Sequence, residues 1–128
     1  MRALLDTHTF IWAATEDPRL SSDAIEAIAD GSNQIILSVV SAWEIAIKFA
    51  AGRLDIPEEP RAYLASRVPM FDLTVLPLAL EHALRVGDLP HHHRDAFDRL
   101  LIAQAQVERI PIITSDLNIA RYDVEVIR

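Results

Sequence analysis

The sequence predicts an α/β fold in which helices cover both faces of a mostly parallel sheet of about five short strands. Short apolar runs of strand length alternate with longer segments of helical periodicity along the chain. Glycine, proline and helix-capping residues stand between these segments, where turns are needed. The 128 residues are 51% hydrophobic, and a chain of this length buries roughly 65–70% of its extended surface. We therefore expect residues 1–128 to form one domain with a substantial core.

The first part of the chain contains a strand followed by two helices, then a second strand followed by a third helix. In order, these segments are Ala3–Leu5, Thr7 to about Ala14, Ala24–Ala29, Gln34–Ser38 and Val39–Ala51. Pro18 breaks the pattern after the first helix, Gly31 ends the second and Gly52 ends the third. The sequence Ser21-Ser22-Asp23 is typical of a cap for the second helix. These signals predict two strand–helix units side by side.

The third helix carries an apolar stripe, and we expect this stripe to face the core or a partner chain. Its members recur at helical spacing: Val39, Val40, Trp43, Ile47 and Ala50. We interpret the stripe as a packing surface rather than as a platform for nucleobases.

The second part of the chain continues the alternation of helices and strands. The predicted segments are a helix over Tyr63–Val68 opened by Pro57–Pro60, a strand at Leu73–Leu76, a helix at Leu78–Val86 closed by Gly87, a helix at Asp95–Glu108, a strand at Ile110–Thr114, a helical turn at Asn118–Tyr122 and an edge strand at Val124–Ile127. No repeat or linker interrupts this order, so the pattern favours a single sheet.

Composition and charge limit the possible functions. The chain has no cysteine, which excludes disulfides and thiolate metal sites and fits a reducing compartment. The apolar run at the N-terminus is too short for a signal peptide, and no stretch approaches the ~20 apolar residues of a membrane span. We therefore expect a soluble cytoplasmic protein without membrane contact. The net charge of −7 argues against a general nucleic-acid binder but permits an enzyme that acts on nucleic acid.

Five carboxylates occupy positions that this fold would bring together. Asp6 directly follows the first strand, and Asp116 follows the strand at Ile110–Thr114. Asp95 and Asp98 are three residues apart at the start of one helix, so they share a helix face. Glu44 lies in the middle of an apolar helix. Ligands of open parallel sheets bind beyond the carboxyl ends of the strands, and several carboxylates there suit one or two Mg²⁺ ions.

A simpler interpretation explains most of these acids as helix caps. Asp is a preferred N-cap residue, and Asp6, Asp95 and Asp116 each precede or open a predicted helix. Asp98 fits the first turn of its helix, where the helix dipole favours an acid. Glu44 decides our preference for metal, because a buried carboxylate without a cation costs several kcal/mol. Lys48, four residues further on, offers an ordinary salt bridge as the alternative.

Other polar residues near the acids are weaker candidates for contacts with a ligand. The run His91-His92-His93 is interpreted as a loop rather than a zinc site, because consecutive residues rarely point at one ion. We expect His93, Arg94 and Arg99 to contact a phosphate backbone near the acids. Thr7, Thr114 and Ser115 flank the acids and either bind the ligand or cap helices. These six residues form the predicted substrate-binding set.

Four blocks of this sequence, spread over essentially the whole chain, carry the acids: Leu4-Leu5-Asp6-Thr7-His8, Ser41-Ala42-Trp43-Glu44-Ile45, His92-His93-Arg94-Asp95-Ala96-Phe97-Asp98-Arg99-Leu100-Leu101-Ile102-Ala103-Gln104-Ala105 and Ile113-Thr114-Ser115-Asp116. Together and in this order, these blocks resemble the PIN-domain family, most closely its VapC-type toxins of type II toxin–antitoxin systems. Ala96 departs from the family pattern, in which proline is frequent at this position, but the acids are unaffected.

The resemblance implies a three-layer α/β/α sandwich and an endoribonuclease that depends on Mg²⁺ or Mn²⁺. It assigns metal binding to Asp6, Glu44, Asp98 and Asp116, and places Asp95 beside them as a further catalytic acid that orients the water. It also implies a homodimer that is silenced by a cognate antitoxin protein. The free toxin would arrest translation by cutting tRNA, ribosomal RNA or messenger RNA. The target, the antitoxin and the choice of metal are left open.

Two other functions remain compatible with the residues alone. One is a phosphoryl-transfer or receiver-type domain with Asp6 as the phosphate acceptor, although Lys48 is the only lysine in the chain. The other is a non-catalytic interaction module whose acids are caps and salt bridges. The sequence has no cysteine and no Gly-rich phosphate loop that would supply a rival catalytic site.

Overall fold

The computed structural model describes residues 1–128 and contains one five-stranded sheet in which every pair of neighbouring strands is parallel. The strands, in chain order, are β1 (Arg2–Leu5), β2 (Gln34–Ser38), β3 (Thr74–Leu76), β4 (Ile112–Ile113) and β5 (Val126–Ile127). Their order across the sheet is β3-β2-β1-β4-β5. The predicted parallel sheet is thus confirmed. Strand β4 starts later than expected because the N–H of Ile110 still donates to the carbonyl of Ala105 (3.0 Å) in the turn after a helix.

Six α-helices and two 3₁₀ turns connect the strands. The helices are α1 (Thr7–Thr15), α2 (Ser22–Ala29), α3 (Val39–Ala50), α4 (Pro60–Met70), α5 (Leu80–Arg85) and α6 (Ala96–Glu108), and the 3₁₀ turns are η1 (Val86–Asp88) and η2 (Ile119–Arg121). The predicted helix Leu78–Val86 is shorter at its start, and its end tightens into η1 instead of stopping before Gly87. None of the helices combines the length and the apolar character needed to cross a membrane.

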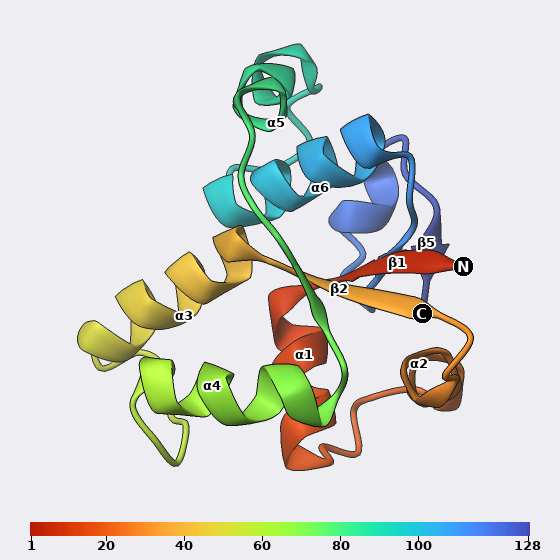
Figure 1. Ribbon diagram of the computed structural model, residues 1–128. Coiled ribbons are helices and arrows are strands. Elements are labelled where there is room, and N and C mark those ends of the chain that lie inside the picture. Colours follow the sequence, from red (N-terminus) through yellow and green to blue (C-terminus); the bar gives the residue numbers. More distant parts are fainter.

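The sheet separates two apolar cores, as expected for a sheet covered on both faces. On one side, α6 and η2 pack on side chains of β1, β2 and β4, with Leu101 and Ile112 fully buried. On the other side, α1, α2 and α4 cover the sheet, with Phe10 and Tyr63 buried there. Figure 1 shows the resulting three layers, with α6 above the sheet and α1 and α4 below it. Leucine and isoleucine side chains alternate between the two cores along β1 and β2.

Helix α3 does not bury most of its apolar stripe in the core of this chain. Of the predicted apolar stripe only Val40 is buried, whereas Trp43 is 47% exposed and Ile47 is 45% exposed. The buried side instead contains Ser41, Glu44 and Ile45. Of the two locations expected for the stripe, this chain's own core is excluded for Trp43 and Ile47, because α3 turns its polar side chains toward the carboxyl ends of the strands. The stripe remains available for a partner chain.

Candidate metal centre

Four of the predicted acids meet beyond the carboxyl ends of the strands. Asp6 follows β1, and Asp116 follows the neighbouring strand β4. Glu44 reaches the same place from α3, and Asp98 reaches it from the first turn of α6. The start of α3 lies close to α6, at the end of the sheet to which β1 and β2 run (Figure 1). The negative charges of Asp6, Glu44 and Asp116 all act on Asp98 and raise the pKa of its carboxyl group.

Thr114 links the two acids that follow the central strands. Its hydroxyl group donates to Asp6 Oδ2 (2.7 Å) and accepts from the backbone N–H of Asp116 (3.0 Å). Asp6 is 4% exposed, and although it is the N-cap residue of α1, its side chain makes no capping hydrogen bond. Burial raises the pKa of Asp6 above its usual range, and the hydrogen bond from Thr114 opposes that shift. Asp6 is therefore not explained as a cap.

Glu44 is a buried carboxylate with only one of its two oxygens satisfied. Its side chain forms an ion pair with Lys48 through Oε2, as the salt-bridge alternative predicted. The other oxygen, Oε1, is buried without any hydrogen-bond partner. An unsatisfied buried oxygen on a charged group costs at least about 1–3 kcal/mol. A cation that binds to Glu44 Oε1 would recover this free energy.

Asp98 has the most strongly perturbed ionisation in the molecule. Burial, followed by the charges of the neighbouring acids, raises the pKa of Asp98 to about 8. Its Oδ2 atom lies 3.1 Å from His93 Nε2. Asp98 thus lies among acids whose charge is offset by one nearby ammonium group, that of Lys48 beside Glu44.

The capping interpretation holds for Asp95 and in part for Asp116. The Asp95 carboxylate accepts the backbone N–H of Asp98 (2.9 Å) at the start of α6, and its side chain is exposed. Asp116 Oδ1 accepts the backbone N–H of Asn118 (2.8 Å) in the turn before η2. Each of these acids keeps a second carboxylate oxygen for another partner.

Several residues of the predicted substrate-binding set have structural contacts instead. Arg99 is 7% exposed, and its guanidinium group donates to the carbonyl of Pro90 (2.8 Å) and to Tyr122 Oη (3.0 Å). The guanidinium group is thus engaged inside the protein, which leaves the predicted contact of Arg99 with a phosphate backbone without support. The Thr7 hydroxyl is buried against Ser41 Oγ (2.8 Å), where it joins α1 to α3.

The remaining members of this set differ in their exposure. Thr114 is buried and holds Asp6 rather than facing solvent. Arg94 and Ser115 are exposed beside the acids, and their contact with a substrate stays a prediction. His93 is directed at Asp98 by its hydrogen bond.

The donor set fits a divalent cation, although the side chains are not gathered tightly around one point. No three Asp, Glu or His side chains converge closely enough to enclose an ion in their present orientations. Four carboxylates, one of them with the unsatisfied buried oxygen Glu44 Oε1, nevertheless offer the all-oxygen chemistry that Mg²⁺ and Mn²⁺ prefer.

Comparison with known proteins assigns the chain to a family. A match to the PIN domain covers residues 3–125, which is almost the whole sequence. The chain belongs to the PIN-domain family. The resemblance found in the four sequence blocks is thereby confirmed at the level of the family.

One curated relative in this family is Ribonuclease VapC16 of Mycobacterium tuberculosis. It is 39% identical over 70 residues, which correspond to 52% of this chain and 48% of that protein. The alignment therefore spans about half the length of this relative.

Solved structures share the PIN fold at low sequence identity. VapBC2 from Rickettsia felis, bound to a DNA fragment from its promoter, gives a TM-score of 0.73 at 16% identity and covers 98% of this chain and 97% of that chain. FitAcB from Neisseria gonorrhoeae gives 0.67 at 19% identity, covering 98% and 96%. A toxin–antitoxin complex from Klebsiella pneumoniae gives 0.65 at 19% identity, with the same coverage. At these identities the likeness shows the fold alone, and it confirms the three-layer architecture.

Sequence reasoning missed two side chains that support the acids in this PIN domain. Ser41 joins Thr7, and Tyr122 contacts His93 through its hydroxyl group. Ser41 stands in one of the four sequence blocks, so its position was a usable signal. Tyr122 had none, because it lies outside those blocks, and its contact with His93 joins positions 29 residues apart.

Proposed function

We propose that this protein is a metal-dependent endoribonuclease that hydrolyses phosphodiester bonds in RNA, with Mg²⁺ or Mn²⁺ held by Asp6, Glu44, Asp98 and Asp116. The observation that carries the proposal is the cluster itself: four acids from four elements, with Glu44 Oε1 buried and unsatisfied and the pKa of Asp98 raised to about 8. Ribonuclease is the name of the curated relative, and the shared fold supports the same class of activity here.

A divalent ion bound by these acids would lower the pKa of a water and neutralise charge on the phosphate oxygens. The chain's own groups supply the rest. Thr114 holds Asp6 in place through its hydroxyl group, and His93 does the same for Asp98. Asp95 is exposed next to Asp98, with one oxygen engaged as the helix cap, and its second oxygen would orient a water. Hydrolysis of this kind leaves a 5′-phosphate and a 3′-hydroxyl group.

The alternatives proposed from sequence are less well supported. A phosphate acceptor has to be reached by its donor, whereas Asp6 is buried and its carboxylate accepts from Thr114. An interaction module has no need of acids with a raised pKa. Burial of like charges lowers stability, and acids perturbed in this way are concentrated at functional sites. Both considerations favour the nuclease.

Purified protein is expected to cut total RNA at discrete positions with Mn²⁺ or Mg²⁺ and to lose this activity in EDTA. The physical reason is that a divalent cation held by the four carboxylates would lower the pKa of a bound water, so that the water can attack phosphorus near neutral pH. Mapping of the cut ends identifies the target and tests for a 5′-phosphate. Cleavage that persists in EDTA would contradict a metal mechanism, and inactive protein that binds Mn²⁺ would contradict the ribonuclease.

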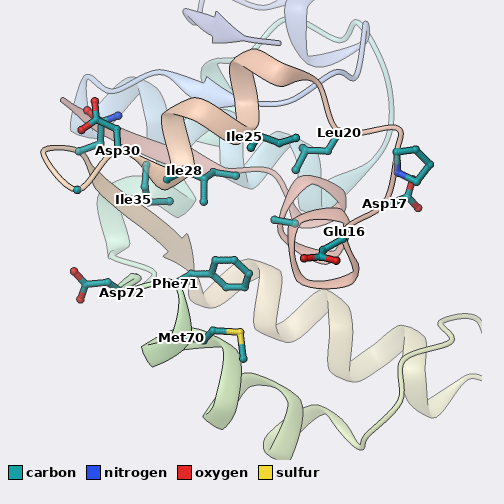
Figure 2. A pocket seen from close by; sticks show the side chains of 15 residues that line it. Glu16, Asp17, Leu20, Ile25, Ile28, Asp30, Ile35, Met70, Phe71 and Asp72 are labelled. Atoms are coloured by element: carbon teal, nitrogen blue, oxygen red, sulfur yellow. The ribbon is translucent and has the colours of Figure 1, made fainter.

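We propose that an antitoxin protein covers part of this chain, as a partner with apolar side chains and basic groups. Two hollows away from the acids support this. One, of about 650 Å³, lies between α1, α2 and the end of α4. Figure 2 shows its apolar floor, with Ile28, Leu20 and Phe71, and acids at its margin, among them Glu16 and Asp72. The other, of about 900 Å³, is a groove between α3 and α4 that includes Phe49 and Leu64. The solved structures with this fold include toxin–antitoxin complexes.

We propose that two copies of the chain form a homodimer through exposed apolar side chains of α3 and α5. Val39, Trp43 and Ile47 are exposed on α3, and Leu80 and Leu84 are 76% and 67% exposed on α5. Both helices contact α6, and exposed apolar side chains that form a large patch commonly mark an interaction site.

Replacement of Trp43 by glutamate is expected to convert this dimer to monomer, because a charge would be buried at the centre of the contact. Sedimentation velocity at micromolar concentration measures the change. Ile25→Glu is the matched control, because Ile25 is 50% exposed on α2 and lies outside this surface. A monomeric wild-type protein, or equal effects of both variants, would contradict the proposed dimer surface.

A further inference from the structure

A chain of hydrogen bonds runs from the core to the carboxylate of Asp98. Its outer link is the contact of His93 Nε2 with Asp98 Oδ2 at 3.1 Å. Behind His93, the ring nitrogen Nδ1 lies 2.8 Å from the hydroxyl oxygen of Tyr122. Tyr122 is 4% exposed and belongs to the core on the α6 side of the sheet. The link to Asp98 is thus anchored in the protein interior.

Two further donors are directed at the same hydroxyl oxygen. Arg99 Nη1 donates to Tyr122 Oη at 3.0 Å, and the backbone N–H of His93 donates to it at 3.3 Å. Arg99 also binds the carbonyl groups of Pro90 and Val86. It therefore fixes the segment that leads to His93 as well as the phenol group behind it.

These contacts determine where the proton of the His93 ring lies. An arginine and a backbone N–H can only donate, so they occupy the two lone pairs of the Tyr122 oxygen. The hydroxyl proton is then directed at His93 Nδ1, which must act as an acceptor. A neutral imidazole that accepts at Nδ1 carries its proton on Nε2. The Nε2–H group therefore donates to Asp98.

We propose that Tyr122, held by Arg99, is a positioning residue for the metal centre: it fixes His93 as the tautomer that donates from Nε2 and so aims the Asp98 carboxylate. With Oδ2 held by His93, Oδ1 is left to the cation. The inference rests on the proposed function, because it gives Asp98 the role of a metal ligand. Hydrogen-bonding partners behind metal ligands commonly change metal affinity by about 10- to 100-fold when they are removed.

Tyr122→Phe tests this role, because it removes the hydroxyl group and keeps the ring. We expect the metal-free variant to show a mixture of His93 tautomers by ¹⁵N NMR, in contrast to a single Nε2–H form in the wild type. We expect its dissociation constant for Mn²⁺, measured by titration calorimetry, to rise by about tenfold. RNA cleavage should fall at limiting Mn²⁺ and recover as Mn²⁺ is raised.

Two further variants separate positioning from a general effect on the fold. Tyr63→Phe is the matched control, because Tyr63 is a buried tyrosine of the opposite core whose hydroxyl has no hydrogen-bond partner. It should leave Mn²⁺ affinity unchanged. His93→Gln places an amide N–H near Asp98 without needing a tautomer, so adding Tyr122→Phe to it should have no further effect on affinity. The His93→Gln spectrum also identifies the His93 resonances.

Different results would contradict the inference and the proposed function. A His93 ring protonated at Nδ1 in the wild type, or a Tyr122→Phe variant with unchanged tautomer and Mn²⁺ affinity, overturns the inference. An equal loss of affinity on adding Tyr122→Phe to wild type and to His93→Gln also overturns it, since the tyrosine would then act through the fold. Absence of Mn²⁺ binding by the wild type would instead overturn the proposed function.

Discussion

Replacement of Asp98 by asparagine is expected to abolish metal-dependent RNA cleavage while making the folded protein more stable at neutral pH. The loss of a carboxylate that binds the cation should lower the cleavage rate by roughly 1,000-fold. The gain in stability, about 1–3 kcal/mol, comes from removing a carboxyl group that its buried, acidic surroundings keep protonated at neutral pH, a cost that the unfolded chain does not bear. The asparagine carbonyl can still accept the hydrogen bond from His93, so no contact of Asp98 with its own core is lost.

The direction of the stability change follows from the pKa of Asp98. Its value of about 8 in the folded protein lies above 3.8, the value for the unfolded chain. Between these two pH values the folded state binds a proton that the unfolded state has released, so the free energy of unfolding decreases as pH rises. Asp98→Asn removes this dependence, and its advantage over wild type should therefore be largest near pH 8 and vanish below about pH 4.

Urea denaturation at pH 5, 7 and 8 measures this advantage, and a cleavage assay with Mn²⁺ measures the loss of activity. Asp23→Asn is the matched control, because Asp23 is an exposed acid in the first turn of α2 and changes the net charge equally. It should cost only a few tenths of a kcal/mol through the helix dipole and leave cleavage intact. An Asp98→Asn variant that is both active and less stable would show that Asp98 is a structural cap.

The order of strands and helices was predictable because its signals are local. Apolar runs, Ser21 as a cap and glycines after helices depend on neighbours in sequence, and they placed all five strands of the sheet. The shared location of Asp6 and Asp116 was also predictable, because parallel strands end at one edge. The orientation of α3 was not. Its apolar stripe fitted the core or a partner chain equally well from the pattern, and the contacts of Ser41 with Thr7 and of Glu44 with Lys48 decide which side is buried.

Side-chain direction explains the other differences at the site. Arg99 is one residue from Asp98, and sequence proximity alone favoured a contact with phosphate. Its long side chain instead extends to Tyr122, which is 23 residues away in the chain. Such contacts depend on how η2 packs against α6, and no local pattern encodes that packing. The same argument applies to Thr114, whose hydroxyl group is turned toward Asp6 by the pairing of β1 with β4.

Binding of Mn²⁺ is expected to stabilise the protein more strongly at pH 8 than at pH 6. A ligand at 100 times its dissociation constant stabilises a folded protein by ~2.7 kcal/mol. Burial and the neighbouring acids raise the pKa of Asp98 to about 8, so at pH 6 the cation has to displace a proton from Asp98, and this competition lowers the apparent affinity. Metal-free protein shows the opposite trend, because its acids repel one another more as they ionise.

The two trends meet in one experiment, thermal unfolding from pH 5 to pH 9 with and without Mn²⁺. The gap between the two curves should widen as pH rises toward 8, and Asp98→Asn should reduce it and remove its pH dependence. This result would show that binding of the cation and release of the proton from Asp98 are coupled. A gap of constant size across this range, or one of equal size in Asp98→Asn, would mean that Mn²⁺ binds elsewhere on this acidic chain. The stabilisation by Mn²⁺ would then not come from the acids beyond β1 and β4. The free energy cost of burying four acids there would have no cation to offset it.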